Sequence, residues 1–209
     1  MNKAILARKV GMTQVYDEKG RVIPVTVLEA GPCHVVQVKS MDNDGYNSIQ
    51  LGFKDKKEHR VNKPLKGHFQ RAKLKPQQYL REFRVEDSAG YSPGQEIKAD
   101  CFSAGESVDV SAIAKGKGFA GAIKKMGFGR GPKTHGSHYY RGPGSLGSVD
   151  AARVFKGRPL PGRMGGWRIT VQSLDVVEVD AGKNMILVKG SVPGPKGGLV
   201  EIKESVKGN

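Results

Sequence analysis

One glycine-rich, strongly basic stretch, Lys115–Arg168, limits what this chain can fold into. Its 54 residues include 14 Gly and 4 Pro, so no long helix or strand can run through most of it. They also include 12 Lys or Arg against one acid, Asp150, a net charge of +11 out of +15 for the chain. The stretch has too few apolar side chains to form a core of its own. We therefore expect a long excursion from a folded body.

Aromatic residues are interleaved with these charges, which favours a polyanion with exposed bases as the partner. The six rings are Phe119, Phe128, Tyr139, Tyr140, Phe155 and Trp167. A flexible, solvated linker is the alternative, although a linker has little use for Trp and paired Tyr. The predicted RNA contacts in this stretch are Lys115, Lys117, Lys124, Lys125, Arg130, Lys133, His135, His138, Tyr139, Tyr140, Arg141, Arg153, Lys156, Arg158, Arg163, Trp167 and Arg168.

The rest of the chain has the composition of an ordinary soluble body. It carries 23 basic and 19 acidic residues and is large enough for a real core. The isoelectric point of about 9.9 indicates an anionic partner. A membrane surface is the rival partner, but it would require a long amphipathic helix, and no apolar run has the length of a signal peptide or a membrane span. Cys33 and Cys101 form no CxxC pair, so we expect two buried, reduced thiols and a cytoplasmic protein.

Short β patterns separated by turn clusters run along this body, and their spacing predicts a mainly β fold, as a small barrel or a sandwich. Pro24 predicts an edge or a bulge in its strand, and a phase slip near Ser173 predicts a bulge. The expected strands are Val10–Tyr16 and Arg21–Leu28 (a hairpin), Cys33–Lys39, Tyr46–Phe53, Tyr79–Val85, Glu96–Phe102, Ser107–Ala114, Ile169–Val179, Met185–Lys189 and Leu199–Ile202. The body is thus expected over 1–114 and 169–209, with 115–168 as the extension.

A second basic segment, Lys54–Arg84, has a net charge of +8 in 31 positions. A short helix is expected at Lys66–Lys73, with Phe69 packed on the body. The segment is either a solvated surface insertion or a second face that contacts phosphates, and the sequence leaves both open. The secondary RNA contacts predicted here are Lys54, Lys56, Lys57, Arg60, Lys63, Lys66, Arg71 and Lys73.

One further helix is expected inside the excursion. In Gly118–Met126, the apolar residues Phe119, Ile123 and Met126 share a helical face, while Lys124 and Lys125 point away from it. We expect this helix to anchor the excursion, with its apolar side on the body.

Motifs for catalysis or cofactor binding are weak. Gly116–Gly121 matches G-x-G-x-x-G, but the acid that a dinucleotide site needs about 20 residues later is missing. Gly127–Thr134 resembles a P-loop with Pro132 in place of the second Gly. His135 and His138 have only Asp150 nearby, so we expect no metal and no cofactor. Two other functions are considered for the chain. One is a nucleotide-dependent enzyme that uses Gly116–Gly121, and the other is a nonspecific cytosolic RNA-binding protein.

Taken together, several motifs resemble the bacterial large-subunit ribosomal protein L3 family nearly from end to end. The motifs are Lys9–Thr13, Ile23–Val27, Arg81–Arg84, Ser111–Gly121, Thr134–Ser137, Arg141–Ser145, Val154–Gly157, Val171–Val177 and Leu187–Gly190.

The resemblance implies a β-barrel of the kind found in translation factors, and no enzyme. It implies a body near the 3′ end of the large rRNA, a loop of about Gly127–Arg163 that approaches the peptidyl-transferase centre, and a role early in subunit assembly. The tip of the loop would lie near Arg141–Val154, and other ribosomal proteins would be its neighbours. Some family members carry a methylated glutamine where this chain has Ser148, so that modification is expected to be absent.

Overall fold

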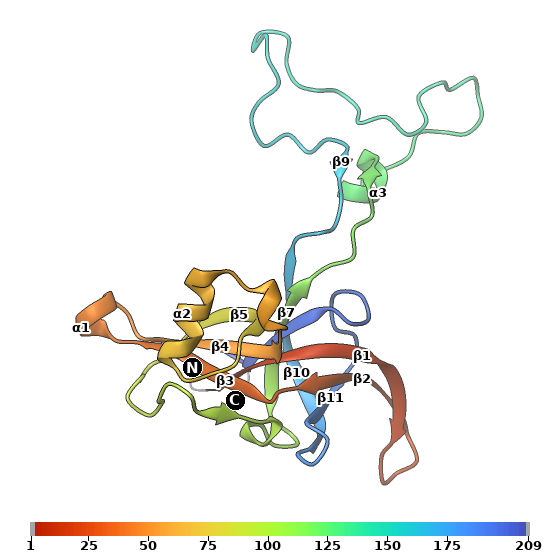
Figure 1. The fold of residues 1–209 in the computed structure, drawn as a ribbon. Helices are drawn as coiled ribbons and strands as arrows, with labels where there is room; N and C mark the ends of the chain where they lie inside the picture. The colour runs from red at the N-terminus through yellow and green to blue at the C-terminus, as the bar shows by residue number, and fades with distance from the viewer. Residues whose placement is uncertain (1–2, 208–209) are drawn as a thin grey trace. The chain divides into compact units, whose positions relative to one another are not determined.

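The computed structural model describes residues 3–207, and antiparallel strands dominate them (Figure 1). Six strands close a barrel in the order β1-β12-β7-β10-β11-β2, which confirms the predicted mainly β fold with a barrel. The barrel strands are β1 Ala4–Tyr16, β2 Val22–Ala30, β7 Ser107–Ile113, β10 Arg168–Asp180, β11 Met185–Lys189 and β12 Leu199–Glu204.

A second sheet of four strands, in the order β5-β4-β3-β6, shares the core of the barrel. Leu6 and Leu28 of the barrel are fully buried in the same cluster as Leu51 and Phe83 of this sheet. One hydrophobic core therefore holds both sheets together. The strands of the second sheet are β3 Cys33–Lys39, β4 Ser48–Asp55, β5 Gln77–Arg84 and β6 Glu96–Ile97.

Short helices and 3₁₀ turns lie between the strands of the second sheet, and the last of them leads from β6 to β7 of the barrel. They are α1 Met41–Asp44, the 3₁₀ turn η1 Glu58–Arg60, α2 Lys63–Arg71 and the 3₁₀ turn η2 Ala99–Cys101. Helix α2 begins where the side chain of Asn62 accepts a hydrogen bond from the Leu65 amide at 3.3 Å, and Pro64 lies in its first turn. Phe69 of α2 is only 1% exposed, as predicted. No helix in residues 3–207 is long and apolar enough to cross a membrane.

The predicted bulge at Ser173 is confirmed, and its cause is visible. The pairing of β10 with β7 shifts register between Val171 and Leu174, and Ser173 has a φ of 52°. The Ser173 amide, which the ladder no longer uses, donates a hydrogen bond of 2.9 Å to the buried carboxylate of Asp109. The bulge thus keeps its backbone donor satisfied inside the barrel wall.

Pro24 lies where only one neighbour strand pairs with β2. It faces Gln14 of β1, whereas the β11 ladder stops at Val25. The edge prediction is therefore confirmed. The bulge in this hairpin lies instead between Lys9 and Gly11 of β1.

One strand prediction was wrong. The strand expected at Glu96–Phe102 ends at Ile97, and η2 follows, because a turn brings both Ala99 and Phe102 into the core while an alternating strand would bury only one of them. Between β3 and β4 the chain turns through the one-turn helix α1, which ends at Gly45 with a φ of 78°.

The chain divides into two compact units. One contains residues up to Ile113 together with those from Arg168 onward, and the other is Ala114–Trp167. The second unit has three small elements, β8 Phe119–Ala120, α3 Ala122–Met126 and β9 Gly162–Arg163.

Gly52 in β4 gives a test of packing between β4 and β5. A Cβ at Gly52 would lie 1.6 Å from Oε1 of the buried Gln77, whose Nε2 is 2.7 Å from Nδ1 of His34. We expect Gly52→Ala to lower the free energy of unfolding by about 1–3 kcal/mol, because Gln77 must move and its contact with His34 breaks.

Gly67→Ala is the matched control, since a Cβ there meets no atom within 4 Å and α2 gains helix propensity of about 0.5–1 kcal/mol. Urea unfolding of both variants checks the prediction. Equal stability of Gly52→Ala and the parent protein would contradict this packing.

Candidate nucleic-acid interface

Two antiparallel chain segments form the base of the unit Ala114–Trp167. Backbone hydrogen bonds join Lys117 N to Met164 O and Met164 N to Gly118 O, both at 2.9 Å, and β8 pairs with β9. Gly165 has a φ of 71°, and a Cβ at this position would lie 2.2 Å from the carbonyl oxygen of Lys115. Glycine is therefore needed where the two segments come closest.

The helix predicted at Gly118–Met126 was wrong in its extent. Phe119 belongs to β8 and is 81% exposed, and α3 starts only at Ala122. Gly121 interrupts the 3.6-residue pattern that Phe119, Ile123 and Met126 suggested. The side chains buried here are those of Ala120 and Ala122, so Phe119 does not anchor the unit as expected.

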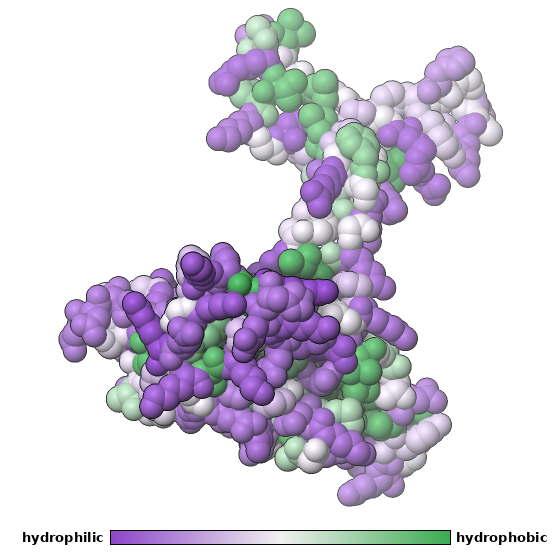
Figure 2. Space-filling model, viewed as in Figure 1, coloured by the Kyte–Doolittle hydropathy of each residue, from purple (hydrophilic) through white to green (hydrophobic). Residues whose placement is uncertain are grey.

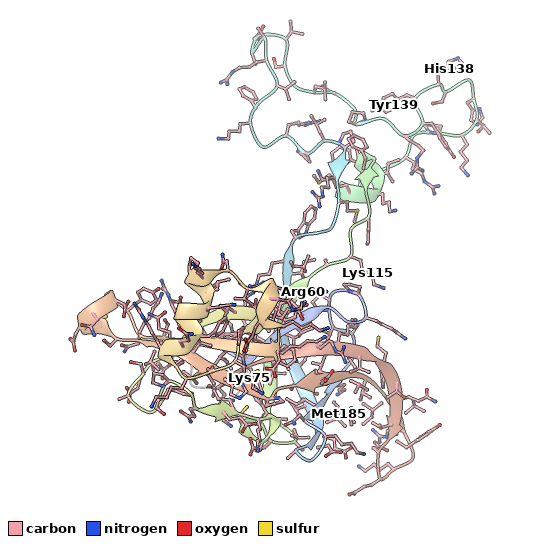
Figure 3. The ribbon with its side chains drawn as sticks, in the orientation of Figure 1. Arg60, Lys75, Lys115, His138, Tyr139 and Met185 are labelled. Carbon is pink, nitrogen blue, oxygen red and sulfur yellow. The ribbon has the colours of Figure 1, made fainter. Side chains whose placement is uncertain are left out.

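From 127 to 161 the chain forms turns and extended backbone, without a helix or strand. The amide of Gly131 donates to the carbonyl oxygen of Tyr140 at 3.0 Å, which closes a loop. The Tyr139 hydroxyl accepts a hydrogen bond from the Gly144 amide, and a Cβ at Gly142 would overlap the Tyr139 ring. Tyr139 therefore packs against a glycine-rich turn and is still 52% exposed (Figure 3).

Nearly all cations of this unit are exposed, and none has an acidic partner among residues 3–207. Of the predicted Lys and Arg contacts from Lys115 to Arg163, only Lys125 is half-buried. No Lys or Arg in Ala114–Trp167 forms an ion pair with a described residue, whereas Arg168, at the start of β10, pairs with Glu201. Two of these arginines make internal contacts: the Arg158 guanidinium donates to the Ser145 carbonyl oxygen, and that of Arg153 lies 5.1 Å from the centre of the Phe155 ring. The positive field of the unit is therefore available to an external anion.

Several predicted ring contacts are also accessible. Phe155 is 54% exposed and Trp167 is 47% exposed, while Phe128 and Tyr140 are half-buried. His138 is exposed beside Tyr139, and His135 is exposed with a φ of 60°. Exposed rings among unpaired cations are suited to stacking on unpaired bases.

The second basic segment forms a polar surface around α2. Of its predicted contacts, Lys56 and Lys66 are half-buried and the others are exposed. Lys66 and Lys73 line a pocket of about 270 Å³ with Lys75 and one acid, Glu58. Lys75, which is not among the predicted contacts, belongs to the same charge run and lines the same pocket (Figure 3).

Neither the thiols nor the histidines form a metal site in residues 3–207, where no cluster of three or more His, Cys, Asp or Glu occurs. Cys33 is buried and Cys101 is half-buried. Burial raises the pKa of the Cys33 thiol to about 12 and that of Cys101 to about 11. Both therefore stay protonated near neutral pH and are poor nucleophiles.

The context that a dinucleotide site requires is missing around Gly116–Gly121. This loop follows β7, but α3 after it has five residues, and every strand pairing in the described chain is antiparallel. A βαβ unit, which would place a pyrophosphate at the start of a long helix, is absent from residues 3–207.

Comparison with known proteins gives the same family that the motifs indicated. A family model described as "Ribosomal protein L3" matches residues 88–184. The protein called "Large ribosomal subunit protein uL3" from Carboxydothermus hydrogenoformans is 64% identical over 100% of both chains, and its namesake from Pelotomaculum thermopropionicum is 59% identical over 99% of both. The chain belongs to the ribosomal protein L3 family. The match to the L3 model spans all of Ala114–Trp167, together with β7 and β10 on either side.

Gly165 tests the geometry of the base. We expect Gly165→Ala to separate the two segments, because the new Cβ would overlap the Lys115 carbonyl and alanine is strained at this φ. Hydrogen exchange at the Lys117 and Met164 amides should then become several-fold faster.

Gly116→Ala is the matched control, since a Cβ at Gly116 meets nothing within 4 Å and its φ lies outside the left-handed region. Unchanged protection of both amides in Gly165→Ala would show that the two segments are not held as described.

Proposed function

We propose that this chain is a structural, non-catalytic rRNA-binding protein of the large ribosomal subunit, in the cytoplasm. The observation that carries the proposal is the set of exposed cations in Ala114–Trp167, which have no acidic partner among the described residues. Relatives that match it over nearly their whole length are named large ribosomal subunit proteins. The rRNA of that subunit is therefore the polyanion that we expect these cations to bind.

Within this proposal, the extension 115–168 makes the main RNA contacts. The loop Gly127–Arg163, with its tip near Arg141–Val154, reaches toward the peptidyl-transferase centre, and the body binds near the 3′ end of the large rRNA. Half of this 37-residue loop spans up to roughly 60 Å when extended, so the loop is long enough to enter RNA. The chain joins the subunit early in its assembly, beside other large-subunit proteins.

The basic surface around α2 serves as a secondary RNA contact. Its support is the pocket whose lining includes three lysines, Lys66, Lys73 and Lys75, and one acid, Glu58. Phosphate neutralisation by lysine is independent of RNA sequence, so this surface adds affinity and not specificity.

Fractionation of ribosomal subunits tests the proposed function. The tagged chain should remain with large subunits after a high-salt wash. Salt weakens phosphate contacts, but stacking contacts and buried packing against the subunit should still retain the chain. A nonspecific RNA-binding protein would be released into the supernatant, and that result would overturn the proposal. Saturable micromolar binding of labelled NAD or ATP by the free protein would favour the enzyme alternative.

Salt dependence tests which cations contact phosphate. If about six basic side chains of the extension meet phosphates, the logarithm of RNA affinity should fall against the logarithm of salt concentration with a slope of roughly −4 to −5. We expect neutralisation of Lys124, Lys125, Arg130 and Lys133 together to flatten this slope by up to about 3. Filter binding at four salt concentrations measures it.

The matched control neutralises four exposed lysines of the body that lie outside both predicted surfaces. They are Lys19, Lys98, Lys183 and Lys207. This variant has the same net charge as the first, so its slope should stay near that of the parent protein. Equal slopes for both variants would move the phosphate contacts away from the extension.

A further inference from the structure

The β1–β2 hairpin continues beyond the barrel as a two-stranded arm. Strand β12 pairs with β1 only as far as Arg8, and β11 pairs with β2 only as far as Val25. Beyond these points β1 pairs only with β2, and Gln14–Tyr16 with Val22–Pro24 form a stretch of two strands alone, because Gly11–Thr13 still pair with Val25–Val27 of β2, which β11 flanks. A two-stranded hairpin that lacks a third strand or a helix is marginally stable in water, so this arm gains most from a surface that covers it.

One face of the arm is apolar and exposed. Met12, Gln14 and Tyr16 of β1 alternate with residues of the opposite face, and Gln14 and Tyr16 lie across from Pro24 and Val22. Met12 is 52% exposed, Tyr16 is 66% exposed and Val22 is 52% exposed. Figure 2 shows hydrophobic surface over the β1–β2 arm, next to hydrophilic surface. Exposed apolar side chains gathered on one face, with Gln14 as the polar residue between Met12 and Tyr16, are typical of an interaction surface on a charged protein.

The charge of the arm argues against RNA as its partner. Its charged residues are Asp17, Glu18, Lys19 and Arg21, so its net charge is zero in a chain of +15. The carboxylate of Asp17 is already used, because its Oδ1 accepts hydrogen bonds from the Lys19 amide at 2.9 Å and the Arg21 amide at 2.7 Å. Binding to phosphates depends on cations that displace counterions, and this arm offers no surplus of them.

The side chains present are those that bind proteins. Met and Tyr are enriched at the centres of protein interfaces, where Tyr combines a large apolar ring with a hydroxyl that can bond to the partner. No described residue hydrogen-bonds the Tyr16 hydroxyl. A second copy of this chain is disfavoured as the occupant, because it would bring another net charge of +15.

We propose that the apolar face of this arm, formed by Met12, Tyr16, Val22 and Pro24, docks on an apolar surface of another protein of the large subunit. This inference rests on the proposed function, because it assumes that the chain is incorporated in the subunit. It assigns protein contact to the neutral arm and RNA contact to the basic segments, so that one chain joins RNA to a second protein.

Photo-crosslinking in assembled subunits tests this assignment. A benzophenone amino acid replaces Tyr16, purified large subunits are irradiated, and the adducts are digested separately with ribonuclease and with protease. The expected adduct survives ribonuclease and contains a peptide of another large-subunit protein, identified by mass spectrometry. An RNA adduct, an adduct between two copies of this chain, or no adduct would overturn the inference.

The same photo-reactive residue at position 139, in place of Tyr139, separates this inference from the proposed function. That position should give an RNA adduct. An RNA adduct from both positions would leave the proposed function standing and overturn docking by the arm. Failure of the chain to enter large subunits at all would overturn both.

A matched pair of variants checks that the apolar face itself makes the contact. With the crosslinker at position 16, Met12→Ser combined with Val22→Thr should reduce the protein adduct several-fold, while the barrel keeps its cooperative thermal transition. Glu18→Ser combined with Lys19→Ser, at the tip, should leave the yield unchanged. Equal yields from both double variants would contradict docking through this face.

Discussion

Pairing between β7 and β10 is the constraint on which the rest of the molecule depends. Ile113 ends one strand, Arg168 begins the other, and the two are ladder partners in a closed barrel. The 54 residues between them therefore leave and return at one fixed place, and the described core cluster takes no side chain from them. Because the core does not need side chains from this segment, its composition is not constrained by core packing. The segment can therefore be rich in glycine, which lets its backbone approach other groups closely, and in cations.

Charge is distributed accordingly. The body neutralises many of its own cations: Lys39 pairs with Glu82 at 2.8 Å, and this hydrogen bond holds the pKa of the Glu82 carboxyl below its usual value. Glu201 joins Arg81 and Arg168 in the same way. Within Ala114–Trp167, in contrast, the only acid is Asp150, so the cations there keep an attractive field for RNA. The neutral apolar arm of β1 and β2 completes the division, with a surface suited to protein.

The sequence predicted most strands and the bulge at Ser173, because alternation is a local signal. It also predicted a helix with a buried Phe69, although α2 spans Lys63–Arg71 and not the expected Lys66–Lys73. It did not separate the second sheet from the barrel, since alternation reports which face of a strand is buried and not which strand lies beside it. It extended α3 too far because three apolar residues imitated a helical period across Gly121. Among site residues, charge predicted exposure well, but the packing of Tyr139 on its glycine-rich turn depends on backbone geometry that composition does not encode.

The most direct test of the central claim replaces Gly127–Arg163 with a short Gly-Ser link and measures equilibrium affinity for large-subunit rRNA together with thermal unfolding. The account predicts that the body keeps a cooperative transition, because closing a shorter loop changes little in free energy. It also predicts that RNA affinity falls by at least about tenfold, with a shallower salt slope, because phosphate contacts are lost. An intact transition with unchanged affinity and slope would contradict the claim that the extension carries RNA binding.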